Sequence, residues 1–181
     1  MIVIINGSVG SGKSTAAYSL QQQFTRSVML DGDCIGAVHP FQIYDDSRIE
    51  YLYDTLLYLI KFHKSNGYQD FVINYVFETS QSLQSLVNRL ETVDPKVCCY
   101  RITCSAEEQK KRIINRNSDQ VDWELQRFIE LNAIQEKAAK TGFIGKKFVT
   151  DGLSPSQIAE RIIMDIKENS CREESELLVG S

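Results

Sequence analysis

Short apolar runs alternate with longer amphipathic stretches along this chain. The apolar runs are nearly continuous and of strand length, and they lie at Ile2–Ile5, Val28–Leu30, Phe71–Val76, Val97–Thr103 and Lys147–Val149. A strand that is covered on both faces carries no alternating polar face. The pattern therefore predicts the five strands of a buried parallel sheet.

Helical periodicity fills the intervals between these runs. Apolar side chains recur at helical spacing through residues 47–65 and stop at Asn66-Gly67, a typical helix end. Ser154, Pro155 and Gln157 are the residue types of an N-cap, a first helical position and a capping box. The sequence thus predicts helices at 13–23, 47–65, 80–93, 106–115, 121–140 and 154–167. Such alternation implies an α/β fold with right-handed crossovers.

The 181 residues are enough for one domain with a full core. We expect this domain to span residues 1–169, and residues 170–181 to form a flexible C-terminal tail after the last predicted helix. Hydrophobic residues make up 43% and charged residues 24%, as in ordinary globular proteins. The net charge of −4 disfavours nucleic acid or an anionic membrane as a partner, but allows a local basic site for a small anion.

The cysteines and the hydropathy pattern indicate a cytoplasmic protein. We expect it to be a monomer or a homodimer. The five cysteines are an odd number without the spacing of a metal site, so we expect reduced thiols. Cys98 and Cys99 are adjacent in a predicted strand and should point to opposite faces of the sheet. No apolar run approaches the roughly 18 residues of a membrane span, and residues 1–8 do not resemble a signal peptide.

A glycine-rich loop follows the first predicted strand. Residues 7–14 match the pattern G-x-x-x-x-G-K-[ST] in full. Glycines let backbone N–H groups approach phosphate oxygens closely, and the start of the following helix favours an anion. Lys13 should reach the β- and γ-phosphates, and Ser14 should bind Mg²⁺. The predicted nucleotide contacts in this loop are Gly7, Ser8, Val9, Gly10, Ser11, Gly12, Lys13, Ser14 and Thr15.

This loop resembles that of the P-loop NTPase superfamily, and the resemblance covers most of the chain. It implies a three-layer fold, in which helices flank a five-stranded parallel sheet and a small helical lid is added. GTPases of the superfamily carry an N-K-x-D motif, which this chain lacks. The short length, the early loop and a late arginine-rich helix resemble the small-molecule and nucleotide kinases. That resemblance implies ATP and Mg²⁺ as cofactors.

Two aspartates follow the second predicted strand, in the segment Met29-Leu30-Asp31-Gly32-Asp33. Ligands bind at the carboxyl ends of the strands in open α/β sheets. A carboxylate there can accept the proton of an acceptor hydroxyl or hold Mg²⁺. Asp33 lies farther past the strand and is the preferred general base, with a metal-orienting role left open. Asp31 is a candidate substrate contact, and both can alternatively be turn residues.

The L-D-G-D segment resembles that of gluconate kinases and adenylylsulfate kinases. His39-Pro40 and the D-D-S-R segment ending at Arg48 also resemble gluconate kinase. His39 is a candidate substrate contact, with a plain loop histidine as the alternative. Arg48 opens the next predicted helix and is a candidate clamp for an anionic acceptor, with an exposed helix charge as the alternative. The third predicted strand has Asn74 where an aspartate is usual, and Glu78 follows. Asn74 and Glu78 are candidate contacts to the acceptor or to Mg²⁺-bound water.

Arg112 and Arg116 are four residues apart in a predicted helix and share one face. This spacing resembles the R-x-x-x-R at the lid entrance of adenylate, shikimate and gluconate kinases. The resemblance implies that Arg112 stacks on the adenine and that Arg116 reaches the transferred phosphates, both of which suit a guanidinium. Residues 116–128 are expected to form the lid, which excludes water and delivers Arg127 as a second catalytic arginine.

Two further segments bear on the nucleotide site. In the kinases that the chain resembles, the loop after the last strand borders the adenine, so Asp151 and Gly152 are candidate nucleotide contacts. A plain turn between strand and helix is an equal alternative. Trp123 and Phe128 are expected to pack within the lid helix rather than to touch a base.

The favoured function is transfer of the ATP γ-phosphoryl group to a hydroxyl of a metabolite or antibiotic. Chloramphenicol-phosphotransferase-like and tunicamycin-resistance-like proteins share the same arrangement of motifs. The expected catalytic residues are Lys13, Asp33, Arg116 and Arg127.

Two alternatives remain open at this point. The first is a nucleotide or nucleoside kinase. A nucleotide kinase should have several arginines around its phosphate-bearing acceptor, but residues 33–94 contain only Arg48 and Arg89. A non-catalytic ATP-binding regulator is favoured by Asn74 in the third predicted strand.

Overall fold

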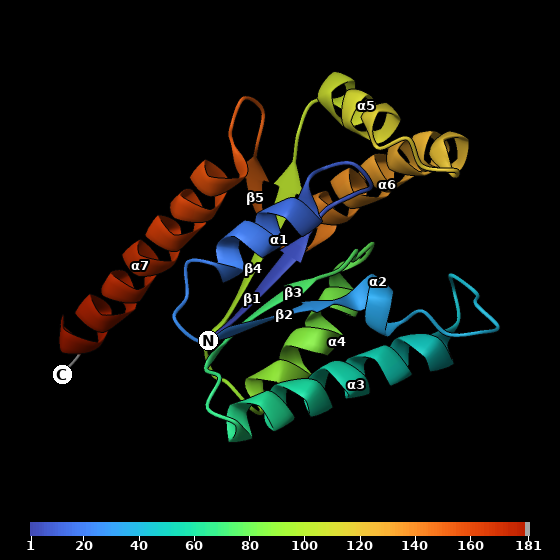
Figure 1. Ribbon diagram of the computed structural model, residues 1–181. Coiled ribbons are helices and arrows are strands. Elements are labelled where there is room, and N and C mark those ends of the chain that lie inside the picture. Colours follow the sequence, from blue (N-terminus) through green and yellow to red (C-terminus); the bar gives the residue numbers. More distant parts are fainter. Residues whose placement is uncertain (180–181) are drawn as a thin grey trace.

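A computed structural model describes the backbone of residues 1–179 and the side chains of residues 1–169. Within these residues, five strands form one all-parallel sheet in the order β2-β3-β1-β4-β5 (Figure 1). The strands are β1 (Ile2–Asn6), β2 (Ser27–Asp31), β3 (Asp70–Asn74), β4 (Val97–Thr103) and β5 (Lys146–Val149). The predicted parallel sheet is confirmed.

The described helices are α1 (Lys13–Gln21), α2 (Gly32–Ile35), α3 (Asp46–Ser65), α4 (Ser80–Glu91), α5 (Ala106–Asn115), α6 (Val121–Thr141) and α7 (Pro155–Val179). All the predicted helices are present, and α2 is an addition. The predicted capping box of α7 is confirmed, because Ser154 Oγ accepts from the Gln157 N–H at 3.3 Å and Gln157 Oε1 accepts from the Ser154 N–H at 2.9 Å.

The last helix is longer than the sequence analysis predicted. Helix α7 continues past residue 167, and no glycine or proline interrupts it before Val179. Of the expected tail 170–181, residues 170–179 are therefore helical, and residues 180–181 lie outside the described residues. No described helix combines the length and the apolar character that a membrane crossing requires.

Helices cover both faces of the sheet, which gives three layers. Helices α1 and α7 lie on one face, and α3 and α4 lie on the other (Figure 1). Ile2 and Ile4 of β1 pack with the α3 and α4 side chains, whereas Val3 and Ile5 pack with those of α1 and α7. Cys98 and Cys99 belong to opposite layers, and the cysteines with described side chains are free thiols, both as predicted.

The strand order fixes where a ligand can bind. Strand β1 lies between β3 and β4, and the chain moves from β1 first to β2 and β3 on one side and later to β4 on the other. A crevice opens at the carboxyl end of the sheet where the strand order reverses in this way. The glycine-rich loop at residues 7–14 follows β1 directly and lies at that point.

Candidate active site

One cavity of about 1210 Å³ opens beside the glycine-rich loop. Its walls come from that loop and α1, from the segment between α2 and α3, from the segment after β3, and from the region joining α5 to α6. The cavity brings together residues that are far apart in the sequence. The sequence-predicted residues that line it are Val9, Gly10, Gly12, Lys13, Ser14, Asp33, His39, Arg48, Glu78, Arg116 and Arg127.

The glycine-rich loop adopts a backbone that its glycines permit. Gly10 and Gly12 have φ angles of 75° and 97°, in the left-handed region. A Cβ at Gly10 would lie 2.7 Å from the Ile113 side chain of α5. The glycines therefore serve both the loop conformation and its close approach to α5.

A buried asparagine fixes the point where β1 turns into the loop. Asn6 is fully buried, and its Oδ1 accepts from the N–H groups of Gly7 at 2.7 Å and Phe77 at 2.9 Å. Gln135 Nε2 of α6 donates to the same oxygen at 3.0 Å and to the Phe77 carbonyl at 2.9 Å. The loop entrance is thus joined to α6 and to the segment after β3.

Two more amide side chains hold the first residues of the loop. Gln109 Nε2 of α5 donates to Ser8 Oγ and, at 2.5 Å, to the Val9 carbonyl. Ser8 Oγ donates to Asn132 Oδ1 of α6 at 2.5 Å, and Asn132 Nδ2 donates to Gln109 Oε1 at 2.9 Å. Sequence analysis missed Asn6, Gln109, Asn132 and Gln135, because an amide on a strand or helix carries no motif.

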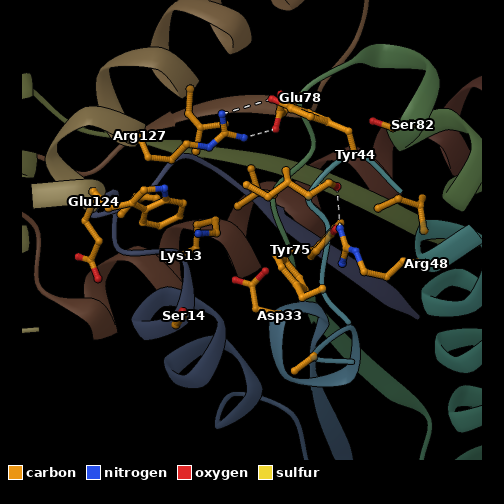
Figure 2. Close-up of a pocket in the computed structure, with 18 of the residues that line it drawn as sticks. Lys13, Ser14, Asp33, Tyr44, Arg48, Tyr75, Glu78, Ser82, Glu124 and Arg127 are labelled. Carbon is orange, nitrogen blue, oxygen red and sulfur yellow. Dashed lines mark hydrogen bonds and ion pairs between the residues drawn. The ribbon is translucent and has the colours of Figure 1, made fainter. Parts of the chain in front are cut away.

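Lys13 and Asp33 face one another across the cavity (Figure 2). Burial lowers the pKa of Lys13, and the nearby Asp33 carboxylate opposes this. Desolvation raises the pKa of Asp33 above its usual value of 3.8, against the pull of Lys13. A carboxyl with a raised pKa beside a buried ammonium is the kind of pair that a proton-transfer site requires.

Asp31 has a different environment from Asp33. As N-cap of α2, its Oδ1 accepts from the N–H groups of Asp33 at 2.9 Å and Cys34 at 3.2 Å. Its Oδ2 accepts from Asn74 Nδ2 at 2.7 Å, and the same nitrogen donates to Ser14 Oγ at 3.0 Å. Asp31 and Asn74 are register partners on β2 and β3, and neither lines the cavity. They lie instead behind Ser14.

This cluster fits Mg²⁺. Asn74 Oδ1 is buried without a hydrogen-bond partner, beside the Ser14 hydroxyl and the Asp31 carboxylate. Magnesium prefers such hard oxygen ligands and usually keeps several waters. Asp31 of the neighbouring strand β2 thus places a carboxylate beside Asn74, where β3 itself has no aspartate.

Arg48 lies at the cavity wall, but loop carbonyls occupy much of its guanidinium. Its Nε donates to the Gln42 carbonyl at 3.0 Å, and Nη2 donates to the Ile43 carbonyl at 3.0 Å. The guanidinium also lies over the Phe41 ring, 4.7 Å from its centroid. Arg48 thus holds the segment between α2 and α3, which includes His39.

Arg127 is buried and paired with acids from two elements. Nη2 donates to Glu78 Oε1, and Tyr44 Oη lies 3.4 Å from Nη1 (Figure 2). Nη1 also donates to Glu130 Oε2 at 2.5 Å. Burial lowers the pKa of Arg127, but the bond to Glu130 and the Glu78 charge outweigh it, and the pKa is raised. Arg127 thus stays charged and joins α6 to the segment after β3.

The two arginines at the end of α5 have different positions. Arg112 does not line the cavity; its Nε donates to Glu108 Oε1 at 2.8 Å and its Nη1 to the Ser11 carbonyl at 3.1 Å. Arg116 lines the cavity with 49% of its side chain exposed, and its Nη1 lies 4.0 Å from Glu124 Oε2. Arg116 can therefore swing toward a ligand.

Four further residues from the sequence analysis are Asp151, Gly152, Phe128 and Trp123, and of these only Trp123 lines the cavity. Asp151 accepts from the Ser105 N–H at 3.0 Å and so joins the loop after β5, with Gly152, to the start of α5. Phe128 is buried, as expected. Trp123 corrects the expectation for the lid helix, because it lines the cavity and is 48% exposed. Trp123 lies on the first turn of α6.

Comparison of the sequence with protein-family models and with curated proteins gave no match. Solved structures match over most of the chain. The tunicamycin resistance protein of Deinococcus radiodurans has a TM-score of 0.63 and 19% identity, over 91% of this chain and 94% of that one. A sugar kinase of Janibacter sp. HTCC2649 has a TM-score of 0.61 and 17% identity, over 91% and 94% respectively.

A shikimate kinase of Acinetobacter baumannii, solved with shikimate, has a TM-score of 0.60 and 16% identity, over 93% of each chain. Each of these likenesses covers at least 91% of this chain. The chain therefore has the three-layer α/β fold of the small P-loop kinases, as the sequence predicted.

Proposed function

We propose that this protein is a kinase that transfers the γ-phosphoryl group of ATP to a hydroxyl of a small molecule. The observation that carries the proposal is that Lys13 of the P-loop and Asp33 of α2 border one cavity beside Ser14. The kinases among the structural neighbours support the same class of reaction.

In the proposed reaction, the acceptor oxygen attacks the γ-phosphorus while the bond to the β-phosphate oxygen breaks. Asp33 accepts the hydroxyl proton, and Lys13 stabilises the charge that develops on the phosphoryl oxygens. Arg116, which is half exposed at the cavity mouth, moves onto the same oxygens. Arg127 organises the wall through Glu78 and Tyr44. We propose that residues 116–128 act as the lid that excludes water.

The two aspartates divide the remaining work in this proposal. Ser14 and, through water, Asp31 would hold Mg²⁺, with Asn74 orienting both side chains. When bound, Mg²⁺ supplies further neutralisation of the β- and γ-phosphates. Arg112 and the loop at Asp151 and Gly152 would border the adenine. Asp33 is then free for the acceptor.

Replacement of Lys13 tests the proposal. Lys13→Ala should lower acceptor-dependent ADP release by at least about 100-fold, because a preorganised positive charge at the transferred phosphate is lost. ADP release is measured by a coupled assay on a panel of hydroxyl compounds. Thermal unfolding should be changed little.

The matched control is Lys61→Ala, an exposed lysine on α3 away from the cavity. It should leave ADP release and melting temperature unchanged. If Lys13→Ala retained full turnover, the P-loop would not be the site of phosphoryl transfer. If the wild-type protein bound ATP but released no ADP with any acceptor, the protein would be a non-catalytic ATP-binding regulator, and the proposed kinase function would be rejected.

A further inference from the structure

The acceptor side of the cavity is distinct from its phosphate side. We define the acceptor half as the walls formed by Asp33, by residues 37–49, by residues 75–82 and by α6 from Trp123 onward. The phosphate half contains the P-loop with Lys13 and Ser14, together with Arg116. An acceptor that meets the γ-phosphate must lie in the first half.

Acidic groups outnumber basic ones in the acceptor half. Asp33, Asp46, Glu78 and Glu124 line it, against Arg48 and Arg127, and the other titratable groups there are His39, Tyr44 and Tyr75. Glu78 and Glu130 already pair with Arg127, and Arg48 donates to two loop carbonyls. An anionic acceptor would therefore meet more carboxylates than guanidinium groups, and both guanidinium groups already have partners. Like charges at close range in a partly desolvated cavity are strongly unfavourable.

Large apolar side chains occupy the rest of the acceptor half. Phe41 is 55% exposed, Ile43 38%, Tyr44 72% and Trp123 48%, and all four line the cavity. Apolar surface gathered in a concave site, with a few polar groups among it, is typical of a pocket that a ring-bearing ligand fills. Tyr53 and Tyr75 extend the same wall inward.

The volume adds a constraint on size. Pockets for drug-sized ligands are roughly 300–1,000 Å³. The cavity of about 1210 Å³ leaves room for an acceptor well beyond a small polyol after the terminal phosphates are placed.

We propose that the acceptor is an uncharged, drug-sized alcohol that carries an aromatic or similarly flat ring, rather than a sugar acid or a nucleotide. This inference rests on the proposed kinase function. It sets aside the expectation that Arg48 clamps an anionic acceptor, since Arg48 holds the loop at Gln42 and Ile43 instead.

The chain offers a direct probe of acceptor binding. Trp123 is its single tryptophan and lines the cavity, so intrinsic fluorescence reports occupancy without turnover. Matched compounds separate charge from ring: phenyl glucoside and phenyl glucuronide differ by a carboxylate, uridine and uridine monophosphate differ by a phosphate, and glucose lacks the ring. Titrations use the full chain with Mg²⁺ and a non-hydrolysable ATP analogue.

Each neutral ring-bearing alcohol should bind at least about tenfold more tightly than its anionic partner, and glucose should bind most weakly. ADP release in separate turnover assays should follow the same order. The inference is overturned if an anionic compound binds as tightly as its neutral partner, or if every neutral ring compound has a Kd above about 1 mM. If the compounds bound in the expected order but no ADP were released, the inferred class of ligand for the acceptor half would stand, and the proposed kinase function would be rejected.

Two acidic residues of α3 form a matched pair for the charge argument. Asp46 lines the cavity, whereas Asp54 is exposed outside it and pairs with Arg89. Asp46→Asn should strengthen phenyl glucuronide binding several-fold with no change for phenyl glucoside. Asp54→Asn should change neither. Equal effects of the two variants on phenyl glucuronide would contradict the proposed role of cavity charge.

Discussion

Asp31 and Asp33 are two residues apart, yet their carboxylates have different surroundings. Both could be predicted at the ligand edge from the strand that precedes them. The different roles of the two aspartates could not be predicted, because they depend on Asn74. Asn74 is the register partner of Asp31 on the neighbouring strand, and its amide nitrogen donates to both Asp31 and Ser14. In sequence, Asn74 is only a missing aspartate. A residue's role here is set by a neighbour on another strand.

The acid limb of the pH profile tests this division at the residue scale. A general base works only when ionised, and the pKa of Asp33 is raised above 3.8, so kcat/KM should fall as the pH drops through that raised value. Asp33→Asn should lower kcat by about 100-fold or more, remove this limb and leave the ATP KM nearly unchanged. Steady-state kinetics across the pH range measures all three.

Asp31→Asn is the control variant for Asp33→Asn, because it alters the cluster behind Ser14 and not the proposed base. It should raise the Mg²⁺ concentration needed for half-maximal activity. Suppose Asp33→Asn weakened ATP binding and kept the acid limb. Asp33 would then belong to the metal site, and the base assignment would be wrong.

At the scale of elements, helix bounds were predictable wherever a helix is long enough to show periodicity. Helix α5 begins and ends as predicted, and the capping residues of α7 identified its start. Helix α2 was missed because it spans only Gly32–Ile35, about one turn, which is too short to carry a pattern. The contacts of α5 and α6 with the P-loop were missed because they depend on how the helices pack.

Gln109 tests whether α5 positions the P-loop. Gln109→Ala removes the donor to Ser8 Oγ and the Val9 carbonyl. The loop should therefore spend a smaller fraction of the time in the conformation that binds phosphate. The ATP KM should rise about tenfold, which corresponds to one or two lost hydrogen bonds. The acceptor KM should stay within about twofold of the wild-type value. Initial-rate kinetics with each substrate varied in turn gives both constants.

Gln109→Glu sharpens the experiment, since it keeps the shape of the side chain but removes the N–H donor. It should behave like Gln109→Ala, and the exposed control Gln126→Ala should behave like the wild type. Normal ATP affinity in Gln109→Glu would show that packing, not donation to the loop, is what Gln109 provides.

At the scale of the whole molecule, the sheet divides the apolar interior into two separate layers. Alternate residues of β1 supply the two layers, so the near-continuous apolar runs in the sequence correctly indicated cover on both faces. The strand order could not be derived from those runs, because each crossover can place the next strand on either side. The site depends on that order, since β1 must lie between β3 and β4 to open the crevice.

The two layers should contribute independently to stability. Ile60 of α3 and Ile162 of α7 are fully buried on opposite faces. Ile60→Val and Ile162→Val should each lower the free energy of unfolding by about 1 kcal/mol, through one lost methylene and the small cavity it leaves. Because the two sites share no partner, the double variant should lose the sum to within about 0.5 kcal/mol. Urea unfolding of the four proteins measures this, and exposed Ile129→Val is the control. A double variant that departs clearly from additivity would mean that the sheet transmits packing strain from one face to the other.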